Sequence, residues 1–159
     1  MKPMALLLAA VAVCSFFGAV PFACSDIADL APAQILCVEG GESGVLLCTD
    51  GGIAARGETL ERAMIQLKNA APGELLLATV DELVLVSYPP EAGAFLDAGL
   101  RPATSVYLAP ALPESVDALA KYLHEQKDGV TLGMLADGVP RPVPRLVRGV
   151  NGLVVEVAS

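Results

Sequence analysis

The sequence predicts an α/β fold of the α+β type, in which a mixed β-sheet begins with a hairpin and two to three helices pack on it. Three observations support this prediction. Short runs rich in Leu and Val have the composition of buried strands. Two other segments have apolar residues at helical spacing. Gly, Pro and Asp residues separate these segments as turns do. Strands therefore alternate with helices after an initial pair of strands.

Residues 34–38 and 45–49 are predicted to form the initial hairpin. Both are apolar runs, and the segment between them, Glu39-Gly-Gly-Glu-Ser-Gly44, has the composition of a turn. Each predicted strand carries one cysteine, Cys37 in the first and Cys48 in the second. Two alternatives stay open for these cysteines because the strand register decides between them. They form a disulfide if their Cβ atoms face each other, and otherwise they are two buried thiols.

Three helices are predicted from apolar spacing and end signals. The first follows a Thr59 cap and stops at Pro72-Gly73, and its apolar stripe consists of Leu60, Ala63, Met64 and Leu67. A short helix over residues 91–98 ends at Gly99. The third helix has Pro113 in its first turn and ends at Asp128-Gly129. Its stripe consists of Val116, Leu119, Ala120 and Leu123.

Extended segments are predicted between these helices. Residues 74–87 are rich in Leu and Val and form the central strand, with a bend at Asp81-Glu82. These adjacent carboxylates would point to opposite faces of an extended segment, so we interpret them as solvated or turn-forming residues and not as a catalytic pair. Residues 105–109 and 130–135 are two further apolar strands.

The end of the chain, residues 137–159, is predicted to be a tail with one edge strand over residues 153–157. A regular paired strand is not expected earlier in the tail because proline cannot donate to a sheet ladder, and the tail has Pro140, Pro142 and Pro144. The tail also carries Arg141, Arg145 and Arg148. These arginines are interpreted as solvated, or as a basic segment that docks on an anionic membrane surface or on the acidic body of the domain.

The start of the chain has the pattern of an export signal. Residues 4–24 contain no charge and follow Lys2, and Pro21 and Ala23 precede Cys24. A small residue before a cysteine indicates a lipoprotein signal, with residues 1–23 as the signal peptide and Cys24 as the lipid attachment site. The run is also long enough to span a bilayer, so a single-pass anchor and simple secretion remain alternatives. Each outcome leaves the folded domain at or near the outer face of the cell membrane.

Composition and spacing exclude several function classes. Ten basic residues against eighteen acidic ones give a net charge of −8, and Trp is absent, so no nucleic-acid partner is expected. His124 lies near the end of a predicted helix without an evident partner, and we interpret it as solvent-facing. The serines lack a nucleophile-elbow pattern, and Ser43 lies in the hairpin turn. No metal site, cofactor or catalytic residue is predicted, and the chain is not expected to be an enzyme.

Several segments together resemble a known family. They are Cys24-Ser-Asp-Ile-Ala-Asp-Leu30-Ala31 followed by Glu39, then Gly57-Glu58-Thr59-Leu60-Glu61-Arg62-Ala63, Pro72-Gly73 and the run from Leu75 to Val86. In this order they are similar to the Ger(x)C family of spore germination lipoproteins, the C subunits of germinant receptors. The similarity covers about residues 24–110, and residues 24–136 would be the N-terminal domain of that family.

The resemblance implies a non-enzymatic function. The chain would be an accessory or truncated germinant-receptor subunit, tethered through a lipid (palmitate) on Cys24 at the extracytoplasmic face of the membrane. Its partners would be the receptor's membrane subunits, which it would meet by protein–protein contact. The alternative is a secreted small-ligand-binding or enzymatic domain, with a pocket formed by the loops around residues 40–44 and 88–90.

Overall fold

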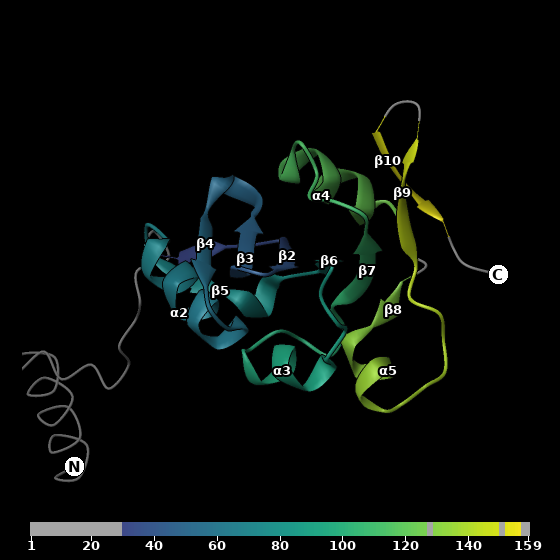
Figure 1. Cartoon of the computed structure of the whole chain (residues 1–159), viewed down its shortest axis with the longest axis horizontal. Helices are drawn as coiled ribbons and strands as arrows, with labels where there is room; N and C mark the ends of the chain where they lie inside the picture. The colour runs from purple at the N-terminus through teal and green to yellow at the C-terminus, as the bar shows by residue number, and fades with distance from the viewer. Residues whose placement is uncertain (1–29, 127–128, 150–151, 157–159) are drawn as a thin grey trace, which may run out of the picture.

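The computed structural model describes residues 30–126, 129–149 and 152–156. The helices and strands in these residues are shown in Figure 1. The strands are β1 (Leu30–Pro32), β2 (Ile35–Gly41), β3 (Gly44–Thr49), β4 (Ala54–Gly57), β5 (Glu74–Leu76), β6 (Glu82–Val86), β7 (Ser105–Ala109), β8 (Val130–Thr131), β9 (Arg145–Gly149) and β10 (Gly152–Glu156). The helices are α2 (Leu60–Ala70), α3 (Ala92–Asp97), α4 (Val116–His124) and α5 (Leu132–Ala136).

The main sheet is mixed, which confirms the predicted fold class. Its strand order is β10-β9-β7-β6-β2-β3-β4, and β8 pairs with β7 outside this path. Strands β2, β6, β7 and β9 run parallel, whereas β3, β8 and β10 are antiparallel to the strands they pair with. Strands β1 and β5 form a separate two-stranded parallel sheet.

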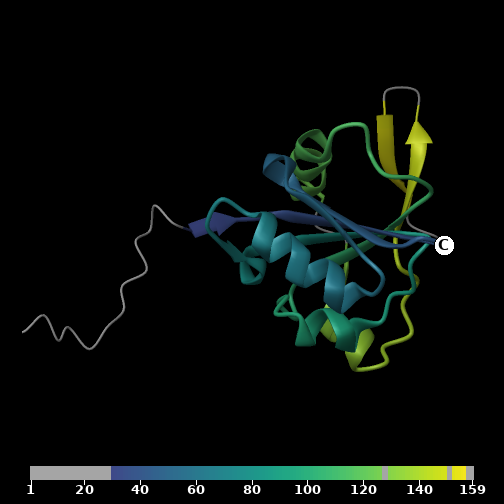
Figure 2. The same ribbon diagram turned by 60° about the vertical axis from the view of Figure 1, so that its left-hand side comes forward.

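Helices cover both faces of the main sheet, as Figure 2 shows. Helix α4 packs on one face, where its buried residues Leu119, Ala120 and Leu123 meet side chains of β2, β6 and β7. Helices α2, α3 and α5 lie on the other face, where Phe95 and Leu132 are fully buried. The first four positions of β2, from Ile35 to Val38, are fully buried because both faces are covered.

The predicted hairpin and first helix are confirmed. Strands β2 and β3 pair antiparallel around a turn that ends at Gly44, whose φ of 107° is a conformation that glycine adopts without strain. Helix α2 begins after Thr59, whose side chain accepts a hydrogen bond from the Arg62 backbone N–H. Its buried residues are the predicted stripe Leu60, Ala63, Met64 and Leu67.

Gly57 explains how α2 packs so closely on the end of β4. A Cβ atom at this position would lie 2.3 Å from the backbone nitrogen of Ala63. Ala63 itself is fully buried. The segment from Gly57 to Ala63 therefore combines a close backbone approach, a helix cap and a small buried side chain, and each depends on the residue type present.

The expected single strand over residues 74–87 is wrong. The structure has β5, then a 3-10 turn over Leu77–Thr79, and then β6. The single hydroxyl proton of Thr79 has two acceptors within reach, the carbonyls of Ala33 and Leu76 at 2.9 and 2.7 Å, and this bonding holds the turn closed. This local side-chain bonding interrupts the strand earlier than the bend expected at Asp81-Glu82.

Two other predicted boundaries are wrong near α4 and α5. Helix α4 begins at Val116 after a Ser115 cap, so Pro113 lies before the helix and not in its first turn, and the helix ends at His124, before Asp128-Gly129. Residues 130–135 are not one strand. Only Val130–Thr131 is extended, because the Thr131 side chain accepts a bond from the Met134 N–H and starts α5.

The tail contributes more to the sheet than expected. Strand β9 begins directly after Pro144 and pairs parallel with β7 through Leu108 and Arg145. Leu146 is almost fully buried under α4. The Pro144 carbonyl accepts a hydrogen bond from the Leu108 N–H at 2.9 Å. Proline lacks only the N–H donor, so the prolines do not prevent pairing before residue 153. The expected last strand is present as β10, paired with β9, and the boundary expected after residue 136 lies within one sheet.

Candidate functional site

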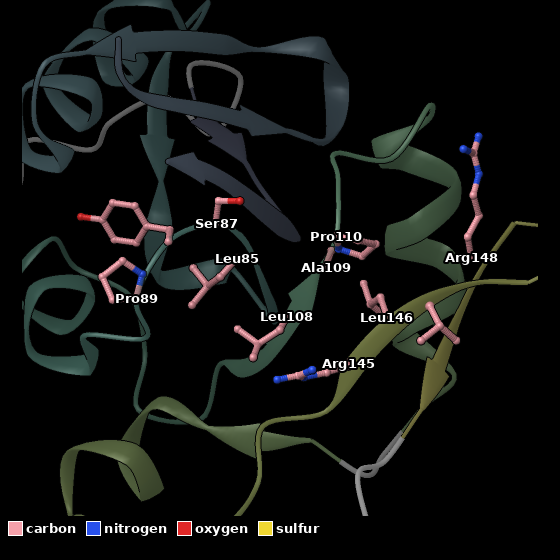
Figure 3. Close-up of a pocket in the computed structure, with 11 residues that line it drawn as sticks. Leu85, Ser87, Pro89, Leu108, Ala109, Pro110, Arg145, Leu146 and Arg148 are labelled. Atoms are coloured by element: carbon pink, nitrogen blue, oxygen red, sulfur yellow. The ribbon is translucent and has the colours of Figure 1, made fainter. Parts of the chain in front are cut away.

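A pocket of about 570 Å³ opens at the carboxyl ends of β6 and β7, beside β9 (Figure 3). In open α/β sheets this edge is where ligands bind, because the chain segments that follow the parallel strands leave the sheet there. The volume is in the range of small-molecule sites. The lining residues come from β6 and the turn after it, from the end of β7, and from β9.

The floor of the pocket is a row of three side chains on neighbouring strands. Leu85 of β6 is the register partner of Leu108 of β7, and Leu108 is the register partner of Arg145 of β9. Partners in register lie side by side on one face, with strands about 4.8 Å apart. Leu85 and Leu108 belong to the core that α2, α3 and α5 cover, whereas Ala109 and Leu146, which also line the pocket, belong to the core under α4.

The side wall is the segment Ser87–Pro89, which leaves β6 in an unusual conformation. Ser87 has a φ of 49°, the left-handed region that residues with a Cβ rarely adopt. Gly40 makes room for this segment, since a Cβ on Gly40 would lie 2.6 Å from the Ser87 carbonyl oxygen. Tyr88 packs edge-on against Phe95 of α3, with ring centroids 6.0 Å apart.

The charged groups of the pocket are two arginines with different surroundings. Arg148 is paired with Glu114, at 3.3 Å, which precedes α4. The Arg145 side chain has no ion pair or hydrogen bond with residues 30–126 and 129–148, and its register partner on β10 is Glu156. No acidic, histidine or cysteine side chain is among the described residues that line the pocket. The pocket therefore offers an apolar floor, a serine hydroxyl and two arginine side chains.

At the amino ends of the parallel strands, opposite the pocket, the sheet contains a buried carboxyl group. Glu82 is only 6% exposed at the amino end of β6, so its interpretation as a solvated residue is wrong. Burial, together with the nearby carboxylates of Asp81 and Asp50, raises the pKa of Glu82 to about 7, and Arg101 opposes this shift. Asp81 is more exposed and forms an ion pair with Arg101.

His124 is the nearest titratable partner of Glu82. Its side chain is 73% exposed, which agrees with a solvent-facing histidine, and its Nδ1 lies 4.0 Å from a Glu82 oxygen. The sequence analysis missed this pair because the two residues are far apart in the chain and only the packing of α4 on β6 brings them together. Because this imidazole is open to solvent, we assign it no catalytic function.

Cys37 and Cys48 are direct partners in the β2–β3 ladder, and both side chains pack toward α4. The structure describes both as free thiols, Cys37 buried and Cys48 half-buried. Burial, with Cys48 and Asp50 nearby, raises the pKa of Cys37 to about 12, and burial with Glu39 nearby also raises the pKa of Cys48. Opposed positions have Cβ atoms about 4.5–5.5 Å apart, slightly wider than a disulfide requires. The disulfide stays one of the two alternatives for this pair.

Cys24, the predicted lipid attachment site, and the apolar run before it lie outside the described residues. Among the residues that are described, no helix is long and apolar enough to cross a membrane. The same residues contain no group of three or more His, Cys, Asp or Glu side chains that would hold a metal ion. Ser43 lies between β2 and β3, where its Oγ contacts Arg56 at 3.3 Å.

Only part of the pocket was predictable from the sequence. Tyr88 and Pro89, named there as loop residues of an alternative binding site, do line it, and Gly40 packs beneath them. Arg145 was interpreted only as a tail arginine. The apolar residue Val147, two positions later, indicates a strand in this region. The proline-rich segment before it led instead to the prediction of an irregular tail.

Comparisons with known proteins add no assignment. No model of a protein family matches the chain, and neither a curated protein nor a solved structure matches it. A function for this chain is therefore a proposal from its own residues, its geometry and the resemblance described above.

Proposed function

We propose that this chain is a non-enzymatic binding domain at the extracytoplasmic face of the membrane. A lipid on Cys24 tethers it, and it acts by protein contact as an accessory or truncated subunit of a spore germinant receptor. The observation that carries the proposal is the short distance along the chain between Cys24 and the folded body. Leu30, the first residue of β1, is six positions after Cys24.

Such a short tether determines which end of the domain lies near the membrane. Six residues reach at most about 20 Å, so a lipid on Cys24 holds β1 close to the membrane surface. Strand β1 leads directly into the amino end of β2, which is parallel to β6 and β7. The pocket is at the carboxyl ends of β6 and β7, and so faces away from the tethered edge. A tethered domain of this kind keeps its binding surface accessible.

The segment from Gly57 to Ala63 supports the family part of the proposal. It is one of the segments that resemble the Ger(x)C family. In this chain Gly57 permits close packing, Thr59 caps the helix, and Leu60 and Ala63 are buried. A domain that shares this β-strand, cap and helix unit would share its fold.

A surface for protein contact lies beside the segment from Gly57 to Ala63. Ile65 of α2 is 48% exposed, which is unusual for a large aliphatic side chain. Strand β4, which α2 follows, is the last strand of the path in the main sheet. An exposed sheet edge beside an apolar side chain is a common way to bind a partner segment. We assign the contact with a membrane subunit to this side of the molecule.

The tether is tested by metabolic labelling with an alkyne fatty acid in a spore-forming host. We expect label on the wild type and on Cys14→Ala, which removes the other leader cysteine, and no label on Cys24→Ala. An unlabelled wild type, or a labelled Cys24→Ala variant, contradicts the tether.

The protein contact is tested by photo-cross-linking in membranes of the same host. A cross-linker at Ile65 should yield an adduct with a multi-span membrane protein, identified by mass spectrometry. The matched control is a cross-linker at Val139, which is 38% exposed on another part of the surface. Equal adducts from the two positions, or none from Ile65, argue against this contact.

A second candidate function, small-ligand binding, is favoured by the pocket itself. It combines the size of a ligand site with a mostly apolar lining. The two functions use different parts of the molecule and do not exclude each other.

A further inference from the structure

We propose that the pocket binds a short, uncharged peptide segment in an extended conformation, which adds a strand to the sheet between β9 and the turn after β6. This inference rests on the small-ligand function proposed above and names the chemical class of the ligand. It does not depend on the lipid at Cys24. Three features of the pocket lead to it: backbone groups on β9 without a strand partner, an interruption of β7 at Pro110, and a balance of charge around the lining.

The inner edge of β9, the edge that faces β7, has backbone groups without a strand partner. The Pro144 carbonyl accepts a hydrogen bond from the Leu108 N–H at 2.9 Å, so it points toward β7. Backbone groups alternate in direction along a strand, so those of Leu146 and Arg148 point the same way. In the described residues β7 pairs with β9 only through Leu108 and Arg145. The Leu146 carbonyl and both backbone groups of Arg148 therefore lie beyond the last paired position.

Pro110 explains why the pairing of β7 with β9 stops there. It follows Ala109, the last residue of β7, and it has no N–H to donate. In a parallel ladder that continued past Leu108, residue 110 would donate to the Leu146 carbonyl. No hydrogen bond joins that carbonyl, or the backbone of Arg148, to a described residue on this side of β9. The pocket therefore lies where a strand is missing from within the sheet.

The pocket has the length of one short strand. All residues from Arg145 to Arg148 line it, which corresponds to about 13 Å of extended chain. The opposite wall is the segment Ser87–Pro89, and Figure 3 shows this wall and β9 on the two sides of the end of β7. An extended peptide of about four residues would have β9 on one side and this wall on the other.

The wall across from β9 is formed before a ligand arrives. Ser87 holds a positive φ, and Gly40 leaves room for the Ser87 carbonyl. Tyr88 packs against Phe95, with ring centroids 6.0 Å apart. A preformed wall lowers the cost of binding, because no loop has to become ordered around the peptide.

The charges around the pocket favour an uncharged peptide. Arg148 contacts Glu114 at 3.3 Å, and Arg145 has Glu156 as its register partner on β10. An acidic ligand would compete with these two acidic residues for the arginines, and a basic ligand would be repelled by the arginines. The other lining residues are apolar apart from Ser87 and the Tyr88 hydroxyl. We therefore assign uncharged side chains to the peptide, with β-branched residues among them because these favour an extended backbone.

Position 148 tests the backbone contact. Proline at this position removes the N–H on the inner edge of β9, whereas alanine removes the same side chain and keeps the N–H. The bonds to β10 come from the alternate residues of β9, so proline leaves them in place. We expect Arg148→Pro to bind the peptide about three- to tenfold more weakly than Arg148→Ala, the loss typical of one hydrogen bond.

Val147 provides an independent position for testing. It lines the pocket and is 36% exposed, so tryptophan at this position fills space that the peptide needs. Val139 is 38% exposed and is not among the lining residues, so Val139→Trp is the matched control. We expect Val147→Trp to lose binding and Val139→Trp to keep it.

The experiment is equilibrium dialysis of radiolabelled Val-Thr-Val-Thr, acetylated and amidated at its ends, against the full chain in lipid nanodiscs, with empty nanodiscs subtracted. We expect saturable binding and competition by the unlabelled peptide. The same peptide with every backbone nitrogen methylated should compete at least tenfold more weakly, because it has lost its N–H donors. Blocked Asp-Thr-Asp-Thr and Lys-Thr-Lys-Thr should also compete more weakly.

Several outcomes would overturn the proposal. They are absence of saturable peptide binding to the wild type, equal competition by the methylated peptide, and equal binding within both pairs of variants. If Arg148→Pro proves unfolded by circular dichroism, Val147→Trp against Val139→Trp decides for the variants alone. Equal binding of the methylated peptide would leave a small-ligand pocket without strand addition, so failure of this inference is distinguishable from failure of the small-ligand function.

Discussion

The two ends of the parallel strands differ in how their polar groups are satisfied. At the amino ends, Asp50 accepts hydrogen bonds from the N–H groups of Gln34 and Ile35, and buried Thr104 donates to the Val80 carbonyl at 2.8 Å. At the carboxyl ends, the Ser87 hydroxyl has no such bond within the described residues. The first end uses its polar side chains to hold the fold, whereas the second leaves this hydroxyl free to meet a ligand.

Glu82 gives the largest expected effect, because it is the buried charge of the amino end. Its pKa is raised from 4.5 to about 7, so the native state prefers the protonated carboxyl. The native state is therefore destabilised as pH rises through this range. The resulting loss in the free energy of unfolding is absent below pH 4.5 and complete above about pH 7, and it amounts to at most about 3 kcal/mol. Thermal melts at pH 5 and pH 8 measure it.

Glu82→Gln should reduce the difference between these two melts and raise the melting temperature at pH 8. Glu61→Gln removes a charge from an exposed position of α2 and should leave the difference unchanged. If Glu82→Gln keeps the full difference in melting temperature between pH 5 and pH 8, a group other than Glu82 causes that difference.

Gly40 gives the next effect, at the carboxyl end. Gly40→Ala puts a methyl group 2.6 Å from the Ser87 carbonyl, and the strand or the pocket wall must move. Overpacking of this kind typically costs about 1–3 kcal/mol. Gly41→Ala, whose nearest contact would be at 4.0 Å, is the control. Urea denaturation of both variants measures the difference, and equal midpoints would show that the wall is not packed on β2.

Ser87 should give a smaller effect of opposite sign. Its left-handed conformation is unfavourable for a residue with a Cβ, so Ser87→Gly should stabilise the fold by up to about 1 kcal/mol. Ser87→Ala keeps the strain and should not stabilise. A stability order of Gly above Ser above Ala, from denaturant midpoints, would establish that strain is stored at the pocket. A loss of stability in Ser87→Gly would contradict it.

The cysteine pair is expected to affect reactivity more than stability. Cys48 is half-buried, whereas Cys37 is buried with a pKa of about 12, so iodoacetamide at pH 8 should modify Cys48 well before Cys37. Peptide mapping by mass spectrometry gives the two rates. If neither cysteine reacts until a reductant is added, the two cysteines form a disulfide. This outcome decides between the two alternatives left open by the sequence.

Periodic patterns in the sequence predicted most of the fold. The stripe from Leu60 to Leu67 and the strand over residues 105–109 were found because burial of one face leaves a regular pattern. Local side-chain bonds that override such patterns were missed. Thr79 closes a turn inside a run of leucines, and Thr131 starts a helix inside a run of apolar residues.

The pocket was harder to predict because its parts meet only through strand order. Leu85, Leu108 and Arg145 are adjacent across the sheet but distant along the chain. Nothing in a single sequence gives the register of β9 against β7. The turn after β6 was recognisable from Tyr88 and the prolines that follow it, since such residues end strands.

The strand order also determines when the sheet is completed as the chain emerges during synthesis. Strands β2, β3 and β4 pair through short connections and are available together, but the other side of β2 pairs with β6, which comes only after α2 and β5. Until then, the apolar residues from Ile35 to Val38 belong to an unprotected edge, which other chains can pair with. The period before β6 pairs with β2 is thus one in which this edge of the sheet is open to another chain.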